Sequence, residues 1–217
     1  MFEAITQVDL NILRFIHDKL HFPVLNEIMW FITHLAEPFI APVYPVIFLA
    51  IGLVIYYRRK KANTLDESWR DKFDFAKLGM MMGVALLFGL IICNLTLKPL
   101  IARPRPYTLD GYADLLMVEL QSEKSFPSGH SVAVFEIAFA VAYATKGHGK
   151  KWGVIAYVMA VLIALSRLYV GVHYPSDVIC GAIIGTVCGI LGVLVVKWIY
   201  KKFIDKHIYK PATKVEE

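Results

Sequence analysis

The chain alternates between long apolar runs and short clusters of charged residues. Four runs, at residues 74–97, 129–145, 153–171 and 176–197, have the roughly 17 to 25 residues with which a helix crosses a bilayer. Runs of this length between charged clusters are typical of membrane-spanning helices and not of a soluble domain. The pattern therefore predicts an all-α integral membrane protein with one span in each run.

The N-terminal part of the chain carries a different pattern. Residues 7–20 mix apolar side chains with charges, which suits either a helix lying in the membrane interface or an ordinary packing helix. Residues 22–57 form a long apolar stretch that Glu37 and Pro38 interrupt, so we expect two short spans there. With the four later runs, these segments predict a single membrane domain over residues 1–217, a six-transmembrane-helix bundle with an N-terminal interfacial helix.

Basic residues give the orientation of this bundle. They gather after the second, fourth and sixth expected spans, within residues 58–77, 146–151 and 197–214. Antiparallel spans place these segments on one side, which the positive-inside rule makes cytoplasmic. We therefore expect a plasma membrane protein with a cytoplasmic N-terminus and a solvated cytoplasmic tail at residues 203–217.

Composition agrees with a membrane protein, because 57% of the residues are hydrophobic and the mean hydropathy is +0.55. The net charge of +5 does not indicate a nucleic acid partner, since the basic residues lie beside the ends of apolar runs. Cys93, Cys180 and Cys188 lie inside apolar runs with no neighbouring His, so we expect buried thiols, no metal and no other cofactor. Glu3 and Asp9 argue against a cleavable signal, and we expect the first apolar segment to be retained.

Three polar stretches, far apart in the sequence, fall at the opposite ends of the expected spans. They are Lys98–Pro106, Pro127–His130 and Ser166–Asp177. The up-and-down order of the spans brings all three to the extracytoplasmic face. Because the orientation was derived from the basic clusters alone, this convergence is independent support for a site at that face.

The residues of these stretches suit a phosphate group. Ser128 and Gly129 precede a long apolar run, so Ser128 can cap a helix whose free N–H groups and dipole point at an anion. Lys98, Arg105 and Arg167 add positive charge, and the Arg side chains can pair with phosphate oxygens through two hydrogen bonds.

Two histidines in these stretches suit phosphoryl transfer. His173 and Asp177 lie four residues apart with Pro175 at the expected first helical position, so the carboxylate can fix the imidazole tautomer and leave one nitrogen nucleophilic. The imidazole of His130 suits proton donation to a leaving oxygen near neutral pH. Phosphoryl transfer needs mainly positioning and charge neutralisation, and cationic side chains can provide both in place of a metal ion.

Together, three motifs resemble the three-part signature of the type 2 phosphatidic acid phosphatase superfamily. They are Lys98-x6-Arg105-Pro106, Pro127-Ser128-Gly129-His130 and Ser166-Arg167-x5-His173-x3-Asp177. Each motif alone is a weak pattern, but all three in order with intact spacing are specific. Soluble vanadium haloperoxidases share the signature, although a chain this short and apolar fits the membrane-bound branch.

The resemblance implies a six-helix membrane bundle that removes phosphate without a divalent metal. It implies that His173 is the nucleophile that forms a phosphohistidine, that Asp177 orients it, and that His130 is the general acid and later activates water. It also implies a phosphate site formed by Lys98, Arg105, Ser128, Gly129 and Arg167.

Size and N-terminal pattern most resemble the bacterial undecaprenyl-diphosphate phosphatases within this superfamily. The expected substrate is therefore undecaprenyl diphosphate, with phosphatidylglycerophosphate, phosphatidic acid and lipid A phosphates as alternatives. A different class of function is a non-catalytic protein that binds or transports a phospholipid, but a mere anion site needs neither the His173–Asp177 pair nor His130. We expect the bilayer and the lipid substrate as partners, and no obligate protein partner.

Three further features have open interpretations. Glu136 lies inside an expected span and is either functional or a structural hydrogen-bonding group. Arg103 lies off the family spacing, and is expected to contact a second phosphate or a lipid headgroup if it binds substrate at all. Residues 107–126 form a long loop that is either a partly helical lid or an inert connector.

Overall fold

The structure is a computed structural model that describes residues 2–62, 74–147 and 149–204. The regular elements in these ranges are all helical, which confirms the predicted all-α class. From residue 205 onward, the expected C-terminal tail lies outside the described residues. The α-helices are α1 (Phe2–Leu20), α2 (Pro23–His34), α3 (Val43–Lys61), α4 (Phe75–Gly89), α5 (Lys98–Ile101), α6 (Gly129–Thr145), α7 (Lys151–Tyr169) and α8 (Pro175–Ile199).

Three helical segments of the described chain are long and apolar enough to cross a membrane. They are Phe75–Thr108, Lys151–Tyr169 and Pro175–Ile204, which contain α4, α7 and α8. In the first and third of them, π-helical turns η2 (Leu90–Leu97) and η5 (Tyr200–Ile204) continue the α-helix. The apolar helix α6 is shorter, at 17 residues.

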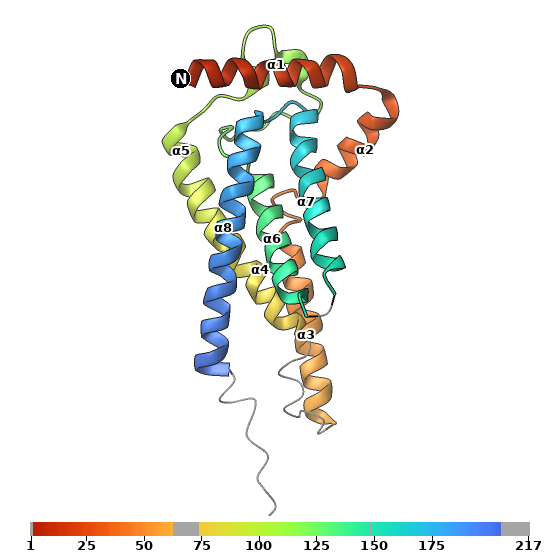
Figure 1. Cartoon of the computed structure of the whole chain (residues 1–217), viewed down its shortest axis with the longest axis vertical. Coiled ribbons are helices and arrows are strands. Elements are labelled where there is room, and N and C mark those ends of the chain that lie inside the picture. Colours follow the sequence, from red (N-terminus) through yellow and green to blue (C-terminus); the bar gives the residue numbers. More distant parts are fainter. Residues whose placement is uncertain (1, 63–73, 148, 205–217) are drawn as a thin grey trace, which may run out of the picture.

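The expected pair of spans at residues 22–57 falls on α2 and α3, with Glu37 and Pro38 in the turns between them, but the two helices run in the same direction along the bundle (Figure 1). Moreover, α2 has only 12 residues, and α3 ends in four consecutive basic residues. The lengths and compositions of the helices therefore do not establish a count of six spans.

Helix α6 lies at the centre of the bundle and packs against α4, α7 and α8. Glycines of α8 allow the closest of these contacts, since a Cβ atom at Gly185 would lie 2.3 Å from the carbonyl oxygen of Val132. A Cβ atom at Gly181 would lie 2.8 Å from the carbonyl oxygen of Ser128. These glycines hold the N-terminal ends of α6 and α8, and hence two of the three motifs, side by side.

Helix α1 lies across the end of the bundle at which α7 ends and α8 begins (Figure 1). Its residues Leu10 and Leu13 are buried against a core cluster that includes Leu115 and Tyr174. Large apolar side chains on its other faces, such as Phe15, remain exposed. The helix therefore covers the end of the bundle where the motifs meet and presents an apolar surface outward.

Candidate active site

The structure brings the three sequence motifs together beneath α1. The backbone N–H of Ser128 donates to the carbonyl oxygen of Asp177 at 3.1 Å, which joins the second motif to the third. From the first motif, Arg105 donates through Nη1 to the carbonyl oxygen of Val172 at 2.9 Å, and this Nη1 lies 3.4 Å from Nε2 of His173. Segments separated by up to about 80 residues therefore share one site, as the motifs predict.

The start of α6 has the expected capped geometry. Ser128 is the N-cap, and its hydroxyl accepts a hydrogen bond from the backbone N–H of Ser131 at 3.4 Å. Gly129 and His130 occupy the first helical turn, where backbone N–H groups have no acceptor within the helix. The Nζ atom of Lys98 lies close by, 3.6 Å from where a Cβ atom of Gly129 would be. The helix N-terminus and the ammonium group thus converge, as an anion site requires.

His173 and Asp177 form the expected pair at the start of α8. Pro175 is the first residue of the helix, and Asp177 accepts from the backbone N–H of Tyr174 at 3.0 Å in a capping box. Two further groups lie near Oδ2 of Asp177: the hydroxyl of Ser125, which donates to it, and His173, whose Nδ1 lies 3.5 Å from it. This separation exceeds a normal hydrogen bond, so Asp177 acts on the imidazole here through charge and position.

The surroundings of His173 favour a neutral imidazole. Its pKa is lowered to about 3, mainly because the ring is buried; Asp177 opposes this effect, and the positive charges of Arg105 and Arg167 add to it. Because Arg105 faces Nε2 and can only donate, that nitrogen carries its lone pair while Nδ1 holds the proton beside Asp177. The geometry thus leaves Nε2 free to attack an electrophile on the cationic side of the ring.

Lys98, Arg105 and Arg167 are all buried, with 7%, 5% and 1% of their surfaces exposed. A guanidinium keeps its charge at neutral pH even when it is buried. Arg167 donates to Thr33 Oγ1 at 2.6 Å, while its Nε has no hydrogen-bond partner in the described part of the chain. Buried charges are costly unless they are paired, so this cluster favours binding of an anion.

Two site residues come from the N-terminal third and were missed by the sequence patterns. Thr33 of α2 contacts Arg167, and Glu37 of the following turn lies with Oε1 3.7 Å from Nε2 of His130. The imidazole holds the pKa of the Glu37 carboxyl below its usual value. The one available signal was an acidic residue next to a proline inside an apolar stretch.

The long loop at residues 107–126 is part of the site. It contains two short 3-10 turns, and Leu115 is buried in the cluster beneath α1. Near its end, Glu123 pairs with Lys98 and Ser125 donates to Asp177. The loop is therefore anchored at both the core and the site, which differs from an inert connector.

Arg103 and Glu136, whose roles the sequence left open, lie in different surroundings. Arg103 donates from Nη1 to Asp177 Oδ1 at 2.7 Å and from Nη2 to Asp9 Oδ2 at 2.9 Å, so its neighbours are carboxylates and not the phosphate site. Glu136 is buried beside Gly89 of α4. It lies six residues beyond His130 in α6, which places it about 9 Å further along the helix axis and outside the site.

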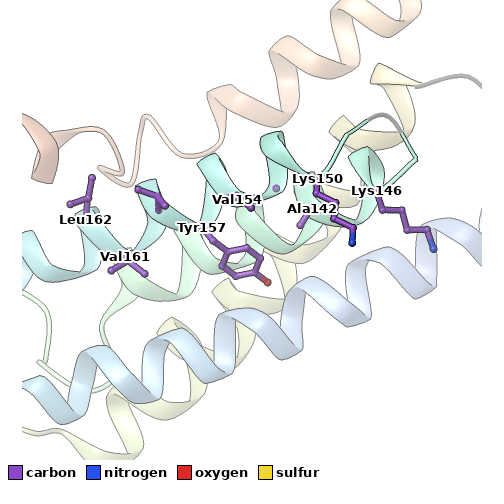
Figure 2. Close-up of a pocket in the computed structure, with 9 residues that line it drawn as sticks. Ala142, Lys146, Lys150, Val154, Tyr157, Val161 and Leu162 are labelled. Carbon is purple, nitrogen blue, oxygen red and sulfur yellow. The ribbon is translucent and has the colours of Figure 1, made fainter.

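A cavity of about 540 Å³ is lined mainly by α7, as far as Leu162, and by Ala142 and Lys146 near the end of α6 (Figure 2). Lys146 and Lys150 lie at one end of it, and the remaining lining is mainly apolar, with Val154, Tyr157 and Val161. It includes none of the motif residues, so the candidate chemistry does not take place there.

Comparisons with known proteins match most of the chain. A family model described as the PAP2 superfamily matches residues 77–202. The phosphatidylglycerophosphatase B of Bacillus subtilis (strain 168) is 34% identical over 172 residues, which cover 75% of this chain and 71% of that protein. The undecaprenyl-diphosphatase BcrC of the same organism is 28% identical over 203 residues, which cover 88% of this chain and 91% of that protein.

A solved structure supports the fold. The crystal structure of a transmembrane PAP2 type phosphatidylglycerolphosphate phosphatase from Bacillus subtilis superposes with a TM-score of 0.63 at 29% identity, covering 92% of this chain and 88% of that one. The resemblance that the motifs indicated is thereby confirmed, together with the membrane-bound branch and the phosphatase class. The chain belongs to the PAP2 superfamily of membrane lipid phosphatases.

Proposed function

We propose that the chain hydrolyses a lipid diphosphate, most specifically undecaprenyl diphosphate, through a phosphohistidine on His173 and without a metal ion. One observation carries this proposal: Nε2 of a buried, neutral His173 faces Arg105, while Asp177 lies behind the ring at Nδ1. An anion site alone would need no imidazole held in this manner.

In the first step, Nε2 of His173 attacks the terminal phosphorus, and the bond from that phosphorus to the bridging oxygen breaks, so that the lipid monophosphate leaves. Protonated His130 gives its proton to that leaving oxygen. In the second step, His130 takes a proton from water, the hydroxide attacks the phosphohistidine, and inorganic phosphate leaves. His173 and His130 then return to their starting protonation states.

The cations supply the electrostatic part of the reaction. Lys98, Arg105, Arg167 and the free N–H groups at Gly129 surround the position of the phosphoryl oxygens, with Ser128 fixing the start of the helix. Charge spreads over three equatorial oxygens in the transition state, and positioned donors stabilise it more than the ground state.

Glu37 extends the site on the side of His130. Its carboxylate lies 3.7 Å from Nε2 of that imidazole and can stabilise the protonated form that donates to the leaving group. His173 with Asp177 would then serve as the nucleophile, and His130 with Glu37 as the general acid.

The membrane placement is part of the same proposal. The single domain at residues 1–217 would cross the plasma membrane with α1 in the interface. The expected six crossings do not fit, because α1 lies at the site end of the bundle and α8 ends at the other end, which requires an odd number. Helices α2 and α3 run in the same direction and would together form one crossing (Figure 1).

The site would be extracytoplasmic and residues 203–217 cytoplasmic. Supporting this, α3 ends in four basic residues at the end of the bundle away from the site. The expected cytoplasmic N-terminus does not fit this orientation, because α1 lies across the site end of the bundle (Figure 1) and its Asp9 accepts a hydrogen bond from Ser176 there.

The choice of undecaprenyl diphosphate rests on the undecaprenyl-diphosphatase BcrC relative, which aligns with this chain over 91% of its own length. Phosphatidylglycerophosphate is the second candidate, because the phosphatidylglycerophosphatase relative has the higher identity of the two, 34%. Phosphatidic acid, lipid A phosphates and non-catalytic lipid binding are the other possibilities that the same experiment separates.

The test is phosphate release by purified protein in detergent with excess chelator, over a panel of lipid mono- and diphosphates and water-soluble phosphate esters. Expected results are the fastest release from undecaprenyl diphosphate, inhibition by vanadate and no activity in His173→Ala. Faster hydrolysis of soluble esters would overturn the lipid assignment, and full activity in His173→Ala would overturn the nucleophile. Lipid binding without phosphate release on any substrate would favour the non-catalytic alternative.

A further inference from the structure

Helix α1 carries one buried carboxylate that reaches the start of α8. Asp9 is 4% exposed, whereas the side chain of Asp18 on the same helix is 51% exposed. Oδ1 of Asp9 accepts from the backbone N–H of Ser176 at 3.1 Å, and Oδ2 accepts from the Ser176 hydroxyl at 2.5 Å. Asp9 therefore binds the residue next to Asp177, from a position 167 residues away from Ser176 in the sequence.

Arg103 completes this connection by dividing its guanidinium between two carboxylates. Nη2 donates to Asp9 Oδ2 at 2.9 Å, and Nη1 donates to Asp177 Oδ1 at 2.7 Å and to the Ser176 hydroxyl at 2.7 Å. The guanidinium carbon also lies 3.7 Å from the centre of the Tyr174 ring. The planar guanidinium is thus held by the Tyr174 ring on one face and by hydrogen bonds at Nη1 and Nη2, which leaves it little freedom to move.

The connection sets how Asp177 meets His173. Because Arg103 takes Oδ1, the carboxylate can present only Oδ2 toward the imidazole, and Ser125 and the Tyr174 N–H hold that oxygen. Asp9 also balances the charge of Arg103, so that Asp177 is not left as the only anion of a buried cation. Loss of Asp9 would transfer the whole guanidinium charge to Asp177 and weaken its hold on His173.

We propose that Asp9 is a positioning residue for the nucleophile, acting through Arg103 and Ser176, so that α1 is a working part of the catalytic site. This inference deepens the proposed function and rests on it. Asp9 and Arg103 contact neither the imidazole of His173 nor the cations of the phosphate site among the interactions in the described chain. Their effect is therefore expected on the reactivity of Nε2 and not on phosphate binding.

The test compares Asp9→Asn with two matched controls on α1. Asp18→Asn removes the same charge from an exposed position, and Arg14→Gln removes an ion pair that ties α1 to Asp114 at 2.5 Å without touching α8. For each variant, kcat, KM and the inhibition constants of vanadate and inorganic phosphate are measured. Vanadate forms a bond to the nucleophile and mimics the transition state, whereas phosphate reports only on the cationic site.

Asp9→Asn is expected to lower kcat by about 10- to 100-fold, the usual cost of removing a group that orients a reactive His. KM and phosphate inhibition should stay within about twofold, while vanadate inhibition weakens by about tenfold or more, in line with differential transition-state binding. Both controls should match the wild type. Arg103→Lys, which keeps the charge but cannot bridge both carboxylates, should show the same selective loss and serves if Asp9→Asn does not fold.

A fall in kcat with an unchanged ratio of the vanadate and phosphate constants would mean fewer folded molecules and would overturn the inference. So would an Asp9→Asn protein that behaves like Asp18→Asn. A wild-type protein without vanadate-sensitive phosphate release would instead overturn the proposed function, and this inference with it. The two failures are distinguishable because only the second one affects the wild type.

Discussion

Asp177→Asn is the change that most directly tests the proposed pair at the start of α8. The substitution keeps the shape of the side chain but replaces one acceptor oxygen by an NH2 group. Oδ1 of Asp177 accepts from Arg103 at 2.7 Å, and Oδ2 accepts from Tyr174 and Ser125. Whichever way the amide turns, its NH2 group faces at least one donor.

The expected cost follows from these contacts. If the NH2 group faces Arg103, a charge-assisted hydrogen bond of about 1.5–3 kcal/mol is lost in a buried site. If it faces Tyr174 instead, the helix cap is lost, at about 1 kcal/mol, together with the bond from Ser125. Stability should therefore fall by about 2–4 kcal/mol, when the lost negative charge is included.

The effect on catalysis should be larger than the effect on stability. Without the carboxylate, the Nδ1–H tautomer of His173 is no longer favoured, and Asp-to-Asn changes beside a catalytic His lower kcat by roughly 10⁴-fold in serine proteases. We expect a loss of about 10³- to 10⁴-fold here. Ser125→Ala is the matched control, because it removes one donor and keeps the carboxylate, so its kcat should fall less than about tenfold.

The assay is rapid-quench trapping of the phosphoenzyme under alkaline conditions, with the folded fraction measured by thermal unfolding in the same detergent. Asp177→Asn should form phosphoenzyme much more slowly than the wild type, at an equal amount of folded protein. A phosphorylation rate within about tenfold of wild type would refute the reasoning, since it would show that the carboxylate does not set the tautomer.

Three other predictions concern His130, the helix packing and pH. Glu37→Gln should lower kcat about tenfold on a lipid monophosphate but much less on an ester with a good leaving group, because proton donation then matters less; equal losses on both would contradict this role. Gly185→Val should lower the thermal midpoint markedly, since its Cβ would lie 2.3 Å from the Val132 carbonyl oxygen, whereas Gly83→Ala, with its nearest atom at 3.8 Å, should be tolerated. His173→Gln should flatten the pH dependence of the free energy of unfolding. Because the pKa of His173 is about 3 in the folded protein and 6.5 in the unfolded chain, only the unfolded chain binds this proton between those two pH values. The wild type therefore loses at most about 1.4 kcal/mol of stability per pH unit as the pH falls through this range. Equal slopes between pH 7 and 5 would contradict this prediction.

Local sequence patterns were sufficient for the helices and for the family residues. Apolar runs predicted segments close to α6, α7 and α8 because membrane helices need long stretches without charge, and α6 has the bounds expected from its run. The motifs predicted which residues meet in the candidate site, because each motif lies at one helix end and fixes its own internal geometry. Ser128 as a cap and Pro175 as the first residue of α8 follow from those short spacings.

The supporting contacts depended on how distant elements fold over the site. Asp9 and Arg103 lie 94 residues apart, and Thr33 and Arg167 lie 134 residues apart. No spacing rule links such pairs, because α1 and α2 reach the motifs through tertiary packing: Leu10 and Leu13 of α1 are buried at the bundle end, and α2 packs against α7. Arg103 is the clearest example. Its place beside Arg105 in the sequence suggested a contact with the substrate, but in the fold it pairs with Asp9 of α1 and with Asp177. A buried charge needs an opposite charge nearby, and only the tertiary structure decides which one lies within reach.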